Sequence, residues 1–238
     1  MSLRNSVIIV ASPRPRVGKT LLARLLTDFH LQEGRAVAAF DVNAGERALA
    51  QFLPEHVTRS TIDDIKGQMA LFDRLIAEDG TDKIVDLGHA SFESFFTLAG
   101  QIGFVEEARN RGIAPAVLYL LTPDRASVEA YSSLQSRLPG AVLVPVHNEI
   151  LSSAQFRHKY GVLGLETVVV RLTQLAPGLR KYVETPPFSF AQSRLAAGAD
   201  TPDEVNNELQ HWLRRNYLEF REIDLRILLR DLKSSFRL

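Results

Sequence analysis

Three adjacent residues, Gly18, Lys19 and Thr20, could together bind a phosphorylated ligand. They follow the apolar run Val7–Ala11 and precede a segment with leucines at helical spacing, so they lie where a strand turns into a helix. Backbone N–H groups at a helix start converge on an anion, a lysine neutralises phosphate, and a hydroxyl binds Mg²⁺. The sequence therefore predicts a phosphate-binding loop, with Leu21 adding a further backbone contact.

The loop departs from the usual glycine-rich pattern. Pro13 stands where the first glycine of G-x-x-x-x-G-K-[ST] is expected, and Pro15 and Arg16 fill two further glycine positions. Proline fixes φ and lacks an N–H donor, so we expect a stiffer loop with fewer amide contacts.

The elements around the loop alternate between strand and helix. Apolar runs at 36–43, 82–88, 114–121 and 141–148 are separated by amphipathic segments at 61–79, 91–112 and 126–138. Strands that are apolar throughout are typical of a parallel sheet covered on both faces. We predict a doubly wound, mostly parallel α/β P-loop NTPase domain over 1–200, and a helical extension over 201–238 packed on it.

The acid at the end of the strand 36–43 gives a second signal. Asp41 and Asn43 lie at the carboxyl end of a strand that should neighbour the first strand, where ligands bind in such sheets. Here the sequence resembles the ParA/MinD-like deviant Walker A ATPases of the SIMIBI class, whose relatives include dethiobiotin synthetase. In that family a K-G-G-x-G-K-[ST] loop is followed by a strand ending in D-x-D.

The resemblance spans roughly Ser6–Ile150 and implies roles for individual residues. Arg14 takes the place of the family's signature lysine, which contacts the partner's phosphates across a dimer. "IVDLGHAS" resembles the Walker B and switch segment, and "LLTPDRASVEAY" and "VPVHNEI" resemble later family segments. The implied roles are Asp41, Asp86 and Thr20 for Mg²⁺, Gly88 near the γ-phosphate, Lys19 for phosphate and Asn148 for the base.

Asn43 marks the most serious departure from the family. The family's second aspartate, at this position, activates the attacking water, and an amide cannot accept the proton. The resemblance thus implies ATP and Mg²⁺ binding, a nucleotide-dependent homodimer and a protein partner or cargo adaptor, in partition, positioning or machine assembly. We expect hydrolysis to be slow or absent.

Two alternatives stay open. A dethiobiotin-synthetase-like enzyme would need a polar, basic pocket from Phe92–Arg109, a region that is mostly apolar and acidic. A pseudo-ATPase scaffold without nucleotide is favoured by Pro13, Pro15 and Asn43 together. The sequence does not separate ATP from GTP or name the partner.

Composition narrows the remaining classes. The 238 residues contain 28 Lys plus Arg and 28 Asp plus Glu, and no Cys, so bulk charge favours neither nucleic acid nor an acidic ligand, and thiol catalysis is excluded. A local basic excess after Arg214 could serve DNA or a membrane surface. The six histidines lack ligand spacing, although His89 could touch a substrate. No apolar run is long enough to span a bilayer, and we expect a cytoplasmic protein.

Overall fold

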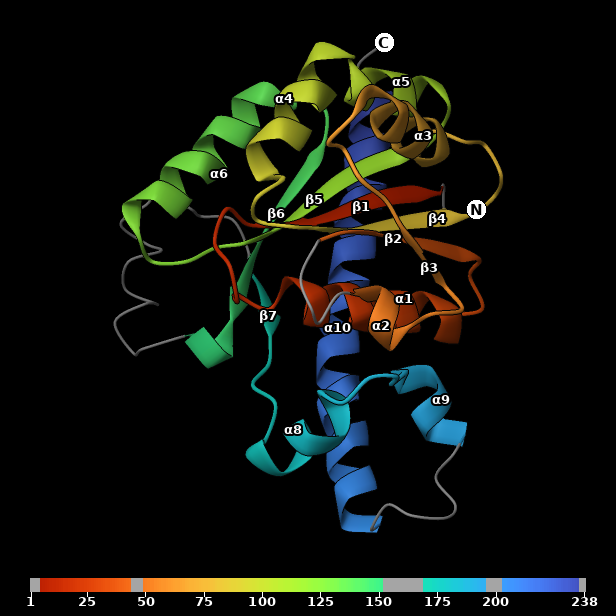
Figure 1. Ribbon diagram of the computed structural model, residues 1–238, viewed down its shortest axis with the longest axis vertical. Helices are drawn as coiled ribbons and strands as arrows, with labels where there is room; N and C mark the ends of the chain where they lie inside the picture. The colour runs from red at the N-terminus through yellow and green to blue at the C-terminus, as the bar shows by residue number, and fades with distance from the viewer. Residues whose placement is uncertain (1–4, 44–48, 152–168, 196–202, 236–238) are drawn as a thin grey trace.

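The computed structural model describes residues 5–43, 49–151, 169–195 and 203–235. Its strands form one seven-stranded sheet in the order β3-β2-β4-β1-β5-β6-β7, and every neighbouring pair is parallel (Figure 1). The strands are β1 (Ser6–Ala11), β2 (Val37–Val42), β3 (Val57–Arg59), β4 (Asp82–Leu87), β5 (Ala114–Leu120), β6 (Val142–Asn148) and β7 (Val170–Leu172). The predicted doubly wound parallel α/β fold is confirmed.

Helices cover both faces of this sheet. One face carries α1, α2 and α10, with α8 and α9 beyond them, and the other carries α3 to α6 (Figure 1). The helices are α1 (Lys19–Gln32), α2 (Leu49–Phe52), α3 (Ile65–Leu75), α4 (Phe92–Gln101), α5 (Phe104–Asn110), α6 (Arg125–Arg137), α8 (Pro177–Val183), α9 (Phe190–Leu195) and α10 (Asp203–Ser235), with a 3₁₀ turn at Glu149–Leu151.

The position of strand β1 inside the sheet explains why its sequence is apolar without alternation. Ile8 and Val10 point into the core under α1 and α10, whereas Val7 and Ile9 point into the core under α4 and α5. A strand buried on both faces needs an apolar side chain at every position. The same reasoning holds for the central strand β5, which is buried along its whole length.

Helix α10 belongs to the core of the first face. Trp212 and Phe220 are 1% exposed, and the ring of Phe220 lies 5.6 Å from that of Phe29 in α1. Arg35, just after α1, pairs with Asp224 of α10 at 2.9 Å. The helix runs unbroken from Asp203 to Ser235, within the predicted helical extension.

Some sequence predictions fall outside the described residues or need correction. The predicted boundary at residue 200 lies outside the described residues. The single helix predicted over 91–112 is two helices, because Gly103 adopts φ 64° between α4 and α5. Glycine reaches this left-handed conformation without strain and so ends one helix and begins the next.

The topology brings three strand ends together. β1 lies between β4 and β5, so the strand order reverses beside it, and the carboxyl ends of β1, β2 and β4 share one edge. Asp41 of β2 and Asp86 of β4 are direct neighbours in register. In open α/β sheets ligands bind outside the strand ends at such a reversal. Among the helices described, none has the length and apolarity needed to cross a bilayer.

Candidate functional site: a phosphate-loop cavity

Gly18 closes the loop between β1 and α1. It adopts φ 97°, and its carbonyl accepts the first helical hydrogen bond from the N–H of Leu22 at 3.0 Å. A Cβ at this position would lie 2.6 Å from Nδ2 of Asn148. Both the backbone angle and the lack of space therefore require glycine at the start of α1.

Arg16 occupies one of the positions where the family has glycine. Its φ is 57°, and it is the only non-glycine residue in the described part of the chain with a positive φ. The left-handed conformation is costly for a residue with a Cβ and free for glycine. The loop therefore keeps a glycine-like backbone at this point despite the substitution.

Lys19 lies over the loop. It is 6% exposed, and its Nζ donates a hydrogen bond of 2.7 Å to the carbonyl of Arg14. Burial lowers the pKa of this ammonium, and the nearby carboxylate of Asp86 opposes the shift. A lysine curled back over its own loop presents its charge to the space that the loop encloses.

Thr20, which is partly exposed, pairs with the buried carboxyl of Asp86. The Thr20 hydroxyl donates to Oδ2 of Asp86 at 2.6 Å, and Asp86 is fully buried. Oδ1 of Asp86 is also buried and, within the described part of the chain, has no hydrogen-bond partner. Burial raises the pKa of this carboxyl to about 7, and the negative charge of Asp41 adds to the effect. An unpartnered buried carboxylate oxygen is costly unless a ligand completes it.

Asp41 organises the chain after β2. Its Oδ1 accepts from the N–H of Asn43 at 3.0 Å, and its Oδ2 accepts from the N–H of Ala50 at 2.9 Å. Burial raises its pKa. These bonds cap the turn that follows the strand, and the predicted role in metal binding stays a prediction. Within the described ranges, no three His, Asp or Glu side chains are grouped so that they alone could hold a metal ion.

The end of β4 approaches the end of β2 closely. The N–H of Gly88 donates to the carbonyl of Val42 at 3.1 Å, and a Cβ on Gly88 would come within 2.8 Å of that oxygen. The side-chain Oδ1 of Asn43 would lie 3.4 Å from this added Cβ. Only glycine fits here, and the fit places Asn43 next to the predicted switch segment. His89, the next residue, is exposed.

Asn148 supports the loop from the side opposite Asp86. Its Nδ2 donates to the carbonyl of Val17 at 2.9 Å, and its Oδ1 accepts from the N–H of Ile150 at 3.0 Å. The residue is 4% exposed. The amide is thus engaged with the loop itself, and its predicted contact with a base stays a prediction.

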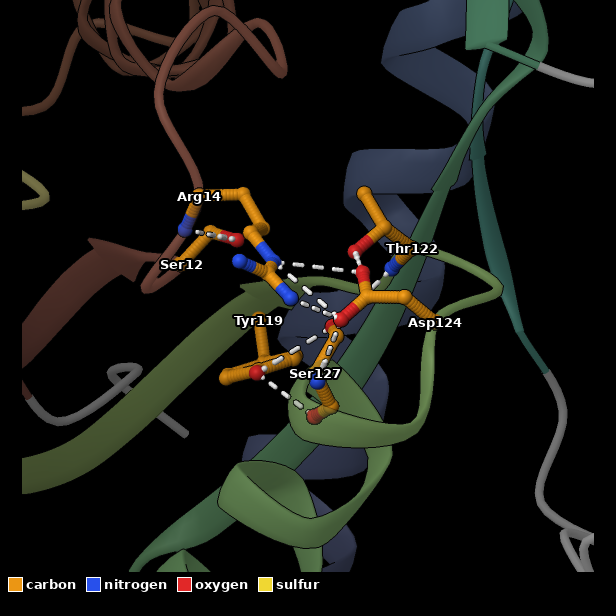
Figure 2. A network of polar contacts seen from close by, with 6 residues as sticks. All are labelled: Ser12, Arg14, Tyr119, Thr122, Asp124 and Ser127. Carbon is orange, nitrogen blue, oxygen red and sulfur yellow. Dashed lines mark hydrogen bonds and ion pairs between the residues drawn. The ribbon is translucent and has the colours of Figure 1, made fainter.

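Arg14 is turned away from the other predicted residues. Its guanidinium pairs with Asp124 just before α6, with Nε 3.1 Å from Oδ1 and 3.3 Å from Oδ2 (Figure 2). Its main chain takes part in the loop, because its carbonyl accepts from Lys19.

The loop borders a cavity of about 770 Å³, which is large enough for a nucleotide. Five of the predicted residues, Gly18, Lys19, Thr20, Leu21 and Asn43, line it together with His89. The other lining residues are Pro15, Arg16, Val17, Arg24, Phe52, Leu175 and Glu184.

Arg24 is the residue that sequence reasoning missed. It is 2% exposed, and its guanidinium lies 3.7 Å from the ring centre of Phe52 and donates to the carbonyl of Val183 at 2.9 Å. Burial lowers its pKa to about 9. Its position four residues after Thr20 puts it on the same side of α1, which is the signal that could have identified it.

Comparisons with known proteins bear on the fold. No protein-family model matches this sequence, and no curated protein sequence matches it either. Among solved structures, the chain is similar to the MinD cell division protein of Aquifex aeolicus, with a TM-score of 0.52 and 16% identity over 83% of this chain and 98% of that one. The MinC:MinD cell division protein complex of the same organism gives a TM-score of 0.51 and 15% identity over 83% of this chain and 97% of that one. The chain therefore has the fold of MinD, consistent with the resemblance to ParA/MinD-like P-loop ATPases.

Proposed function

We propose that this protein binds ATP with Mg²⁺ in the loop cavity and is a ParA/MinD-like nucleotide-binding protein. The observation that carries the proposal is the buried Oδ1 of Asp86, which has no hydrogen-bond partner among the described residues, in a carboxylate whose Oδ2 accepts from the Thr20 hydroxyl. A buried carboxylate oxygen without a partner calls for an explanation, and a bound metal ion at a phosphate-binding loop supplies one. The fold shared with MinD adds support.

The residues that line the cavity, together with Asp86 and Asp41 at the neighbouring strand ends, fit a triphosphate with its metal ion. Lys19 and the backbone N–H groups around Gly18 would neutralise the phosphates at the start of α1. Thr20 and Asp86 would hold Mg²⁺, with Asp41 in its outer shell, because hydroxyl and carboxylate oxygens are the ligands that Mg²⁺ prefers. The bound ion would neutralise phosphate charge.

The base would lie toward Leu175 and Asn148, on the far side of the loop from Asp86. Leu175 lines the cavity and offers an apolar wall. Asn148 would reach the base only by exchanging the bond that it now makes to Val17. The proposal names ATP instead of GTP only because of the family resemblance.

Nucleotide binding is tested by the loss of Lys19. Lys19→Ala removes the ammonium that would face the phosphates while leaving the hydrophobic core unchanged, so calorimetry should show Mg-ATP binding by the wild type and none by the variant. Lys66→Ala, at an exposed position on α3, is the matched control and should bind normally. A wild type that binds no ATP at millimolar concentration would support the scaffold alternative instead.

Turnover should be slow because Asn43 offers no carboxylate. Its side chain lies beside Gly88 at the mouth of the cavity, where an attacking water would have to be activated. General-base assistance is worth roughly 10²–10⁴-fold, so Asn43→Asp should raise steady-state phosphate release within that range. Brisk turnover by the wild type that Asn43→Asp abolishes would show that another residue activates the water.

The output of the bound state would be a homodimer that engages a protein partner. In this proposal Arg14 crosses to the partner subunit's nucleotide. A protein is better supported than DNA or a membrane as the target of α10, because two of its arginines are paired within the molecule, Arg221 with Glu33 and Arg226 with Glu222. Its outward side also carries exposed leucines at Leu218, Leu225 and Leu229.

The region that the ligase alternative needs borders a cavity of about 600 Å³ lined by Glu106, Arg109 and Arg137 among others, but none of its lining residues belongs to the loop cavity. Phe92, Phe95 and Phe96 of α4 are all fully or almost fully buried in the core of the second face. They are therefore unavailable to a polar substrate.

A further inference from the structure

The carboxylate of Asp124 is held in place by contacts that do not involve Arg14. It caps α6 by accepting from the N–H of Ser127 at 3.1 Å, and it accepts from the Thr122 hydroxyl at 2.6 Å (Figure 2). Ser127 is held in turn, because its carbonyl accepts from the hydroxyl of the buried Tyr119 at 2.7 Å. The acceptor that faces Arg14 is therefore rigid and does not follow the arginine if it moves.

Apart from Asp124, little holds Arg14 in place. Its Nε is shared between the two oxygens of Asp124, and a terminal nitrogen makes the closest contact with Oδ1. Its main-chain N–H donates a long bond of 3.3 Å to the hydroxyl of Ser12. The contact with Arg14 is the main reason that the pKa of Asp124 falls to about 2.

The pair lies at the surface, beside the loop rather than inside the cavity. The side chain of Arg14 is 44% exposed and that of Asp124 is 38% exposed. Water screens such pairs, so they exchange readily for a stronger acceptor. A guanidinium that is already paired with a carboxylate offers less of its charge to phosphate, and a triphosphate is the stronger competitor.

We propose that Asp124 is a positioning residue that holds Arg14 in an outward, neutralised state within one subunit and releases it only to a phosphate brought by a second copy of this chain. The inference rests on the proposed function. It deepens that function by naming the contact which competes with dimerisation. The contact would keep subunits apart until one of them presents a nucleotide.

The test removes the negative charge of Asp124 and keeps the hydrogen bond with which its side chain caps α6. Asp124→Asn leaves an oxygen that can still accept from Ser127, so α6 should stay intact. Dimerisation would be measured by analytical ultracentrifugation with Mg²⁺ and a non-hydrolysable ATP analogue. The variant should dimerise about 2- to 5-fold more tightly than the wild type, and the gain should shrink at high salt. Asp64→Asn, at the cap of α3, is the matched control, because Asp64 accepts from the N–H of Gly67 and pairs with no cation among the described residues.

A double variant isolates the arginine. In the background Arg14→Ala, the substitution Asp124→Asn should bring no gain, because there is then no cation to release. In the nucleotide-free protein, the Nε–H resonance of Arg14 should shift between wild type and Asp124→Asn, and an unchanged resonance would overturn the inference.

The outcomes separate this inference from the proposed function. Weaker or unchanged dimerisation of Asp124→Asn, in a wild type that does dimerise with the analogue, overturns the role of Asp124 and leaves the proposed function standing. Absence of a nucleotide-dependent dimer in both proteins overturns the proposed dimer and the inference with it. A dimer seen only in Asp124→Asn supports both.

Discussion

Strand β4 carries a buried aspartate near each end, and the two are held in opposite ways. Asp82, at its first residue, accepts from the N–H and hydroxyl of Ser6 at 2.7 and 3.0 Å, and lies 3.1 Å from Nδ1 of His30 and 2.7 Å from Nε of Arg35. Asp86, four residues later, has one hydrogen bond, from Thr20, and one unpartnered oxygen.

The difference appears in the pKa values of the two carboxyls. Burial alone would raise the pKa of Asp82, but the contacts with His30 and Arg35 lower it well below its usual range. Burial raises the pKa of Asp86 to about 7, and its neighbours do not offset it. A buried carboxylate with a full set of partners contributes to stability, whereas one left incomplete at a strand end is kept for a ligand.

The largest expected effect is a difference in the free energy of unfolding between variants at the two positions. Asp82→Asn should lower the free energy of unfolding by about 2–4 kcal/mol, because it leaves Arg35 and His30 without their buried partner. Asp86→Asn should leave that free energy unchanged or higher, because a neutral amide avoids burying a charge. Urea unfolding of both variants at neutral pH gives the comparison. Equal destabilisation by the two substitutions would remove the distinction.

The contributions of Asp82 and Asp86 to stability should depend on pH with opposite signs. The lowered pKa of Asp82 means that its contribution is present above its unfolded pKa of about 3.8 and is lost as the pH falls through its lower folded pKa. The deficit of Asp82→Asn should therefore shrink as the pH falls below about 4. The raised pKa of Asp86 means that its contribution is full below about 3.8 and is lost as the pH rises toward about 7. The stability of the wild type relative to Asp86→Asn should therefore decline between about pH 4 and 7.

The smallest effect concerns the loop above Asp86. Arg16→Gly should raise the free energy of unfolding by about 0.5–1 kcal/mol, because glycine adopts the observed positive φ without strain. Thermal unfolding of the ligand-free variant measures this. A clear loss of stability would mean that the Arg16 side chain makes contacts that outweigh the strain.

The sequence predicted most of the fold because its strands are apolar on both faces. β2, β4, β5 and β6 were each expected within a residue or two of their observed bounds. The short edge strand β3 was missed because three partly exposed residues, Val57–Arg59, carry no periodic signal. The break at Gly103 was missed because the apolar pattern continues across it.

The site was predictable only where short segments of sequence carry the signal. Gly18, Lys19 and Thr20 could be read from the motif, Asp41 from its strand end, and Asp86 from the resemblance of its segment to the family's Walker B segment. The ion pair of Arg14 with Asp124 joins residues 110 apart, and the burial of Arg24 depends on Phe52 and Val183. Such contacts are set by packing, which a single sequence does not report.

The central claim is that the carboxyl end of β4 is kept for a nucleotide and its metal ion, whereas the amino end holds the fold together. Its most direct test is the shift in Tm that Mg-ATP produces in the wild type, Asp82→Asn and Asp86→Asn. We predict that Mg-ATP raises the Tm of the wild type and of Asp82→Asn by similar amounts, and that Asp86→Asn loses most of the shift. A full shift in Asp86→Asn, or none in the wild type, would contradict the account.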